Sequence, residues 1–302
     1  MQMTEVSATF RCFGGTCAVL VSGDGADDAV AEARRRLLAW HDRFTRFEPT
    51  SELSLLNADE RPEVPVSPDM ARFAEAVVAT AAASGGLVDA TLLGAVESAG
   101  YRNDLRNPLP LALALRLAPP RGPAGPSAEA RWRAIAVNRD AGTVIKPPGI
   151  ALDSGGIVKG LFADMLAEEL AAHESFAIDC AGDLRLGGAA ELRRPVQVAS
   201  PFEDRILHTF ELTSGGIATS GIGRRSWLDA RGRPAHHLLD PSTGRPAFTG
   251  IVQVTALAPT AVEAEMRSKS SLLSGPASAA QWLPHGGVVV LDDGTHEVVD
   301  TS

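Results

Sequence analysis

The sequence has few cysteines and no hydrophobic run that approaches the roughly 20 residues of a membrane helix. Its three cysteines are an odd number that does not build a disulfide framework, and Cys12 and Cys17 lack further ligands at zinc-binding spacing. All three are therefore predicted to be reduced thiols. The stretch MQMTEVSATFRC lacks the basic and apolar segments of a signal peptide, so we expect a cytoplasmic protein.

Positive charge is also scarce, because 28 lysines and arginines face 37 aspartates and glutamates, for a net charge of −9. This balance argues against nucleic acid as a partner and against an anionic membrane surface. An anionic ligand would need a local site, such as a helix N-terminus or a few cations. The 302 residues, 45% of them hydrophobic, can bury a sizeable core and leave room for a deep cleft.

Short strand patterns interrupted by a few helices indicate the α+β class. Residues 7–22 predict two short strands around Gly14-Gly15, and apolar residues at three- and four-residue steps predict helices over 27–47 and 69–84. The later predicted elements are a hairpin of RAIAVN and GTVIK, a helix at about 157–172, strands FAID, LRLGG, PVQVAS, ILHTFELT, GIATS and IVQVTALA, a helix at about 261–274, and a hairpin around Asp292-Asp293-Gly294.

Residues 103–128 differ in composition from the rest of the chain. Six prolines fall between Pro108 and Pro126. The apolar part, LALALRLA, predicts a short helix, and PPRGPAGPS predicts an irregular surface loop. A disordered excursion is the favoured interpretation of this segment.

The run LDSGGIVKGLFAD, residues 152–164, ends a strand at Asp153 and opens a helix after two glycines. Free backbone N–H groups at such a position favour anions, and the glycines let a ligand approach the backbone closely. Lys159 lies one turn into the helix, where its ammonium could reach a phosphate. A plain turn before a helix is the alternative, since the P-loop spacing is absent.

The stretch IDCAGDLRLGG, residues 178–188, predicts a hairpin turn in which an aspartate has a turn-forming role.

Residues 215–247 contain hydroxyl groups and a histidine near turns. Thr219 and Ser220 offer hydroxyls, and His237 stands next to a rigid Asp-Pro turn. An imidazole held there suits general acid–base catalysis, because its pKa lies near neutral pH. A partly buried histidine bonded to neighbouring backbone is the alternative, and His236 is interpreted as structural.

The stretch LAPTAVEAEMRSKSSLLSG, residues 257–275, predicts a helix that begins with a capping box at Thr260 and Glu263. Glu265 and Lys269 then lie four residues apart on one face. From the spacing alone we favour a solvated pair that adds roughly a few tenths of a kcal/mol to the helix.

Together these stretches resemble the FAD:protein FMN transferase (ApbE) family. That family carries D-x-[GS]-[GS]-x-x-K-G, G-G-D, A-T-S-G, H-x-x-D-P-x-T-G and A-D-A-x-x-T runs in this order. The runs are matched here by Asp153 to Gly160, Ala181 to Asp183, Ala218 to Gly221, His237 to Gly244, and Ala264 to Lys269. Earlier stretches are also similar to family motifs: GGTCAVL near Gly14, RFTRFEPTSELSLLN at 43–57, and SGGLVDATLLG at 84–94.

The resemblance implies one ApbE-like domain over residues 1–302, with mixed or antiparallel sheets, flanking helices and an FAD cleft. It also implies transfer of the FMN moiety of FAD to a Ser or Thr hydroxyl of a target flavoprotein, with release of AMP. FAD is then the substrate, and His237 is the base that takes the hydroxyl proton. The residues expected around FAD are Phe47 beside the isoalloxazine, Asp153 and Lys159 in contact, and Thr219, Ser220 and Leu238 at its border.

The metal site that the resemblance implies is altered in this sequence. Family members hold Mg²⁺ with the Asp and Thr of the A-D-A-x-x-T run and a carbonyl of the glycine loop; the corresponding residues here are Glu265, Lys269 and Gly156. An ammonium has three donors and no acceptor, so it cannot ligate Mg²⁺. Either Lys269 replaces the metal as a fixed charge at the pyrophosphate, or the protein is a non-catalytic FAD-binding protein or an FAD pyrophosphatase.

Overall fold

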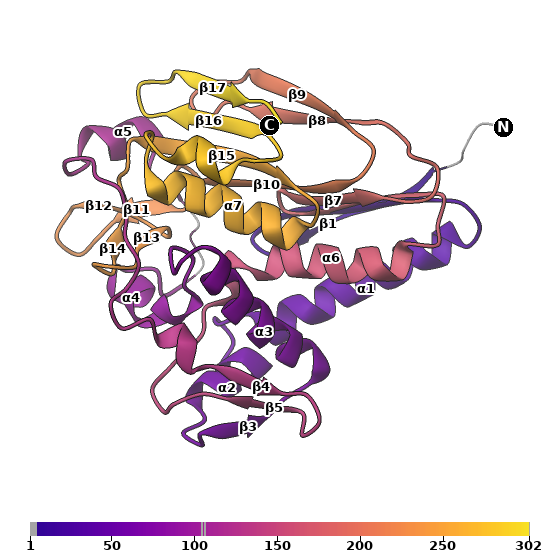
Figure 1. The fold of residues 1–302 in the computed structure, drawn as a ribbon, viewed down its shortest axis with the longest axis horizontal. Coiled ribbons are helices and arrows are strands. Elements are labelled where there is room, and N and C mark those ends of the chain that lie inside the picture. Colours follow the sequence, from indigo (N-terminus) through magenta and orange to yellow (C-terminus); the bar gives the residue numbers. More distant parts are fainter. Residues whose placement is uncertain (1–4, 104, 106, 302) are drawn as a thin grey trace.

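The computed structural model describes residues 5–103, 105 and 107–301. The first four residues of the N-terminal stretch, and residues 104 and 106 of the predicted proline-rich loop, lie outside the described residues. An antiparallel sheet of eight strands runs through the described part of the chain (Figure 1). Its spatial order is β1 (Glu5–Cys12), β2 (Gly15–Ser22), β6 (Ser175–Cys180), β7 (Asp183–Gly187), β10 (Gly215–Gly221), β15 (Ile251–Ala258), β16 (Gly287–Leu291) and β17 (His296–Val299).

Three helices lie side by side along one face of this sheet (Figure 1): α1 (Ala26–Phe44), α6 (Val158–Leu170) and α7 (Ala261–Ser274). The predicted apolar stripe of α1 is buried, with Leu37, Trp40 and Phe44 each at most 2% exposed. The hairpin of β8 (Arg194–Ala199) and β9 (Ile206–Leu212) packs apolar side chains against β7, β10 and β15. The expected α+β architecture with antiparallel sheets and flanking helices is confirmed.

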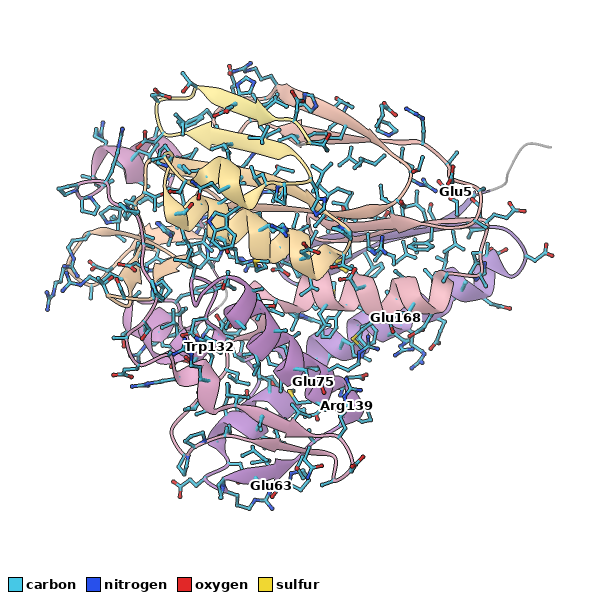
Figure 2. All side chains as sticks on the ribbon, in the orientation of Figure 1. Glu5, Glu63, Glu75, Trp132, Arg139 and Glu168 are labelled. Atoms are coloured by element: carbon cyan, nitrogen blue, oxygen red, sulfur yellow. The ribbon has the colours of Figure 1, made fainter. Side chains whose placement is uncertain are left out.

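A second group of elements lies on the side of these helices that faces away from the sheet, toward the bottom of Figure 1. There α2 (Glu52–Ala58) and α3 (Pro68–Ala83) pack with the small sheet β3 (Glu63–Pro65), β5 (Thr143–Ile145) and β4 (Ala136–Asn138). Glu75 on α3 and Arg139 after β4, both labelled in Figure 2, form an ion pair that ties the helix to this sheet. The remaining elements are α4 (Leu93–Ser98), α5 (Leu111–Arg116), β11 (Ser226–Leu228), β12 (Pro234–His236), β13 (Leu239–Asp240), β14 (Arg245–Pro246), and short 3-10 turns at Ala90–Leu92, Arg131–Ala134, Ser154–Gly156 and Ala279–Trp282.

The proline-rich segment is irregular and contains a short helix, α5, as predicted, but the expectation of a disordered excursion is wrong for its described residues. Gly122 N–H donates to the Phe248 carbonyl at 3.0 Å, and Ala124 N–H donates to the Leu273 carbonyl at 2.8 Å. Unlike the prolines, Gly122 and Ala124 have backbone N–H donors, and these donors bind carbonyl groups of the adjacent core. The segment therefore covers one side of the second half of the fold.

The three cysteines are buried free thiols, as predicted. No helix in the described ranges is long and apolar enough to cross a lipid bilayer. The α7 helix begins at the predicted cap, where the side chain of Thr260 accepts a hydrogen bond from Glu263 N–H at 3.3 Å.

Helices α6 and α7 approach each other most closely at Gly160, where there is no room for a side chain. A Cβ at this position would lie 2.7 Å from the carbonyl oxygen of Ala261 and 2.7 Å from Cα of Val262. The N–H of Gly160 donates to Oε2 of Glu265 at 3.0 Å. This contact holds the polar face of α7 against the glycine turn that precedes α6.

We predict that Gly160→Ala lowers the free energy of unfolding by about 1–3 kcal/mol, because the added methyl meets backbone atoms that cannot rotate away. Urea denaturation measures the difference. Gly94→Ala on α4 is the matched control, since Gly94 is exposed and a Cβ there meets nothing within 4 Å; it should stabilise by up to about 1 kcal/mol. Equal effects of the two substitutions would contradict the close helix contact.

Candidate functional site

A cavity of about 380 Å³ opens where the β1–β2 turn, the end of α1, the start of α6, the β11–β13 segment and α7 meet. Its volume lies in the range of small-molecule pockets. Segments that are distant in the sequence therefore form one wall. The predicted site residues that line the cavity are Phe47, Asp153, Gly156, Lys159, His237, Leu238 and Lys269.

The glycine turn before α6 is anchored by its own side chains. Asp153 Oδ1 accepts a hydrogen bond from Gly155 N–H at 3.1 Å. Ser154 Oγ donates to the Phe44 carbonyl at 2.8 Å, which ties the turn to the last residue of α1. Arg46 Nε lies 3.7 Å from Asp153 Oδ1. The backbone of the turn is thus held at the cavity wall.

Two buried ion pairs stand beside the turn. Lys159 Nζ lies 2.5 Å from Asp183 Oδ2, and Lys269 Nζ lies 2.8 Å from Glu265 Oε1. Glu265 is 1% exposed and Lys269 is 8% exposed. The interpretation of Glu265 and Lys269 as a solvated pair is therefore wrong, because the close packing at Gly160 excludes water from this face of α7.

The pKa shifts of these groups follow from burial and from each other. Burial alone would raise the pKa of Glu265, but the charges of Lys269 and Lys159 outweigh it and lower the pKa. Burial alone would lower the pKa of Lys159, but the carboxylates of Asp183 and Glu265 raise it overall. Both groups are thereby held in their ionised forms. Removing one partner of such a pair leaves an uncompensated buried charge, which is strongly destabilising.

The turn between β6 and β7 is the hairpin that the sequence predicts. Its turn-forming carboxylate belongs to Asp179, which accepts from Gly182 N–H at 2.7 Å. Asp183 instead faces inward and binds Lys159.

The two adjacent histidines face opposite ways. Strands β11 and β12 pair Ser226 with His236, and one step further His237 N–H donates to the Arg225 carbonyl at 3.3 Å. Because side chains alternate along a strand, His236 packs in the core with its ring 4.8 Å from that of Phe248, whereas His237 lines the cavity.

His237 is held in its neutral form. Its Nδ1 is buried and has no hydrogen-bond partner among residues 5–103, 105 and 107–301. Burial, followed by the positive charge of Arg225, lowers the pKa of His237 well below its ordinary value. The imidazole is therefore neutral at physiological pH, and a neutral imidazole has one nitrogen free to accept a proton.

An aromatic wall, which the sequence reasoning found only in part, faces the same cavity. Phe47 is 42% exposed, and the guanidinium of Arg46 lies 4.4 Å from its ring centre and 4.8 Å from that of Tyr101. Tyr101 stacks on Trp227 with ring centres 5.3 Å apart. Arg46 stands beside Phe47 in a motif already noted, but no spacing or motif pointed to Tyr101.

Three predicted site residues do not line the cavity. On β10, Ser220 points toward α7, where its Oγ lies 2.7 Å from that of Ser268. Thr219 points to the other face of the sheet, with its Oγ1 2.8 Å from that of Thr255. Glu265 lies behind Lys269. A direct role for Thr219 and Ser220 at a bound FAD remains a prediction.

The side chains at the expected metal position do not fit Mg²⁺. Both carboxylate oxygens of Glu265 accept from donors, one from the Lys269 ammonium and one from Gly160 N–H. Lys269 Cε lies 3.5 Å from where a Cβ on Gly156 would stand, so the lysine fills the space between α7 and the glycine turn. Mg²⁺ requires a near-ideal octahedron of oxygen ligands, which this arrangement does not provide. A magnesium site at Gly156 and Glu265 remains a prediction from the family resemblance.

Comparison with known proteins gives the family and the fold. Residues 4–291 match the ApbE family. The FAD:protein FMN transferase of Klebsiella pneumoniae is 28% identical over 285 residues, which cover 89% of this chain and 79% of that protein. The enzyme of the same name from Escherichia coli K12 is 28% identical over 149 residues; that match covers 47% of this chain and only 42% of the relative's length. The crystal structure of the ApbE protein from Thermotoga maritima superposes with a TM-score of 0.77 at 22% identity, over 98% of this chain and 97% of that one.

The buried His236 predicts a loss of stability in acid. Burial lowers its pKa from 6.5 to about 3 and outweighs the opposing effect of the Ala247 backbone. Below pH 6.5 the unfolded chain therefore takes up a proton that the folded chain refuses until about pH 3. This difference removes up to about 1.4 kcal/mol of stability per pH unit in that window.

His236→Leu is expected to flatten this acid-side decline, as urea unfolding at pH 7 and pH 4.5 would show. His285→Leu is the control, because the side chain of His285 is 44% exposed. Parallel declines for His236→Leu and the unmodified protein would contradict a neutral, buried imidazole.

Proposed function

Because the chain belongs to the ApbE family, we propose that it transfers the FMN moiety of FAD to a serine or threonine hydroxyl of a target flavoprotein and releases AMP. The observation that carries the proposal is the convergence of the Asp153–Lys159 turn, His237 and Lys269 at one cavity. An anion-binding turn, a neutral imidazole and buried ammonium groups are the parts that attack on a pyrophosphate requires.

The reaction exchanges one phosphorus–oxygen bond for another. The acceptor hydroxyl oxygen bonds to the phosphorus of the FMN half, and the bond from that phosphorus to the bridging oxygen breaks. The bridging oxygen leaves with AMP. The proton of the hydroxyl passes to His237, whose neutral form is the one present at physiological pH. The attacking hydroxyl must lie in line with the leaving oxygen, so the target protein has to reach into the cavity mouth.

Fixed positive charge offsets the charge that grows on the phosphate oxygens. Lys159 and Lys269 both line the cavity, and each is held by a buried carboxylate. Charges that are already oriented in a dry site need no reorganisation during the reaction. We propose that the ammonium of Lys269, fixed by Glu265, takes the place that a metal ion holds in other members of the family, so that catalysis is metal-independent.

The flavin end of FAD would lie against the exposed ring of Phe47 and the apolar side chain of Leu238, which both line the cavity. We propose further that the chain is a single domain over residues 1–302 in the cytoplasm. Its partners are then FAD and a flavoprotein with an acceptor Ser or Thr, and not nucleic acid or a membrane. FAD:protein FMN transferase is the name that the bacterial relatives bear.

His237→Gln tests the base. We expect the rate of FMN transfer to fall about 10²–10⁴-fold, because the amide cannot take the hydroxyl proton, while the Kd for FAD changes little. Mass spectrometry of a candidate acceptor flavoprotein measures the transfer, and flavin fluorescence measures binding. His285→Gln is the matched control, since His285 is exposed and does not line the cavity.

Equal rates for His237→Gln and the unmodified protein would rule out the base role. Formation of FMN and AMP without acceptor labelling would indicate an FAD pyrophosphatase instead. Binding of FAD with neither product would indicate a non-catalytic binding protein.

FMN transfer by the unmodified protein is expected to persist in EDTA, because Lys269 supplies the charge. The double variant Glu265→Asp, Lys269→Thr restores oxygen ligands, so it should bind Mg²⁺ in a calorimetric titration and transfer FMN only when Mg²⁺ is present. Glu265→Asp alone is the matched control, because it keeps a carboxylate opposite Lys269 and should not acquire Mg²⁺ dependence. Abolition of wild-type transfer by EDTA would contradict metal-independent catalysis.

A further inference from the structure

Four cationic side chains line the cavity, and three of them are neutralised by carboxylates. Lys159 is paired with Asp183 and Lys269 with Glu265. Arg46 lies within 3.7 Å of both Asp153 and Glu97. Within the part of the chain that the structure describes, the fourth cation, Arg225, has no carboxylate oxygen within 4.0 Å, and its guanidinium Nη2 donates to the Phe13 carbonyl at 3.3 Å.

Arg225 is held beside His237 by the backbone. The register of β11 and β12, extended by the bond from His237 N–H to the Arg225 carbonyl, places these two residues opposite each other. Side chains of residues that lie opposite on antiparallel strands project on the same face. Both side chains accordingly line the cavity. Ser226 Oγ anchors the strand further by donating to the Leu109 carbonyl at 2.7 Å.

The unpaired charge of Arg225 attracts an anion more strongly than the paired cations of the cavity do. The chain carries a net charge of −9, so its mean field repels an anion. A cation that is paired with a carboxylate contributes little net attraction, whereas an unpaired one contributes its full charge in a site of reduced dielectric. The positive charge of Arg225 also acts to lower the pKa of both His237 and Lys159, which places it close to the two groups that would handle the phosphates.

We propose that Arg225 binds the diphosphate of FAD and holds it next to His237. This inference rests on the proposed function for the identity of the ligand. A guanidinium presents a planar fork of donors that matches phosphate oxygens. One of these donors is fixed by Phe13, so the others are oriented before the ligand arrives. The bound diphosphate then lies between Arg225 and the start of α6, where the helix dipole also favours an anion.

The test compares the Kd for FAD, measured by flavin fluorescence, among the unmodified protein, Arg225→Gln, Arg225→Lys and Arg224→Gln. Arg224 is the matched control, because it is the adjacent arginine, is exposed and does not line the cavity. We expect Arg225→Gln to weaken FAD binding about 10- to 100-fold, as for loss of a charged hydrogen bond. Arg225→Lys should recover part of this, since it keeps the charge and loses the fork. Arg224→Gln should bind as the unmodified protein does.

A second measurement separates electrostatic binding from a structural role. Between low salt and roughly 0.5 M NaCl, the Kd of the unmodified protein should rise more steeply than that of Arg225→Gln, because screening has less charge to act on in the variant. Equal Kd values for Arg225→Gln and Arg224→Gln, or equal salt dependence, would overturn the proposal. So would Arg225→Lys binding as weakly as Arg225→Gln.

These outcomes are distinct from failure of the proposed function. A protein that binds FAD through Arg225 but never labels an acceptor would refute FMN transfer and leave the role of Arg225 intact. If the protein labels an acceptor, and Arg225→Gln binds FAD with the same Kd as the unmodified protein, FMN transfer stands and the role of Arg225 is refuted.

Discussion

The contact between α6 and α7 at Gly160 is the constraint on which the site depends. Without a side chain at this position, α7 comes close enough for Glu265, which binds the ammonium of Lys269 on its own helix, to accept the N–H of Gly160 as well. A residue pair that would be solvated on an ordinary surface helix is thereby buried against the glycine turn. The anion-favouring start of α6 and the lysine of α7 become two sides of the same wall, although about a hundred residues of chain separate them.

Burying these charges has a consequence for how the site attracts its ligand. Lys159 and Lys269 are stable in the interior because Asp183 and Glu265 neutralise them, and the same neutralisation reduces their long-range pull on an anion. In this arrangement the paired lysines are suited to stabilise charge at short range, once a phosphate is in contact. The unpaired Arg225 is suited to draw the anion in. These two different tasks explain why the site contains both paired lysines and an unpaired arginine.

Strand alternation gives the two adjacent histidines different environments. His236 packs against Phe248 in the core, and His237 shares the cavity with Arg225. Their neutral state has the same main cause, since burial disfavours the charged imidazole in both. Only His237 is placed where a proton acceptor can meet a ligand. The hairpin register, rather than the chemistry of the residue, selects between them.

The sequence by itself determined the α+β class, the positions of most helices and strands, and the glycine turn, His237 and the Glu265/Lys269 helix as candidates, because these depend on local periodicity, turn residues and motif spacing. For example, the sequence predicted where α7 begins and ends, its cap at Thr260, and that the cysteines are free. Only the tertiary structure decided that the Glu265–Lys269 pair is buried, that the proline-rich segment is anchored, and that Thr219 and Ser220 stand back from the cavity. It alone also distinguished Arg225 from the adjacent Arg224. Burial, pairing and the direction of a side chain are set by elements that are distant in sequence, so no local pattern encodes them.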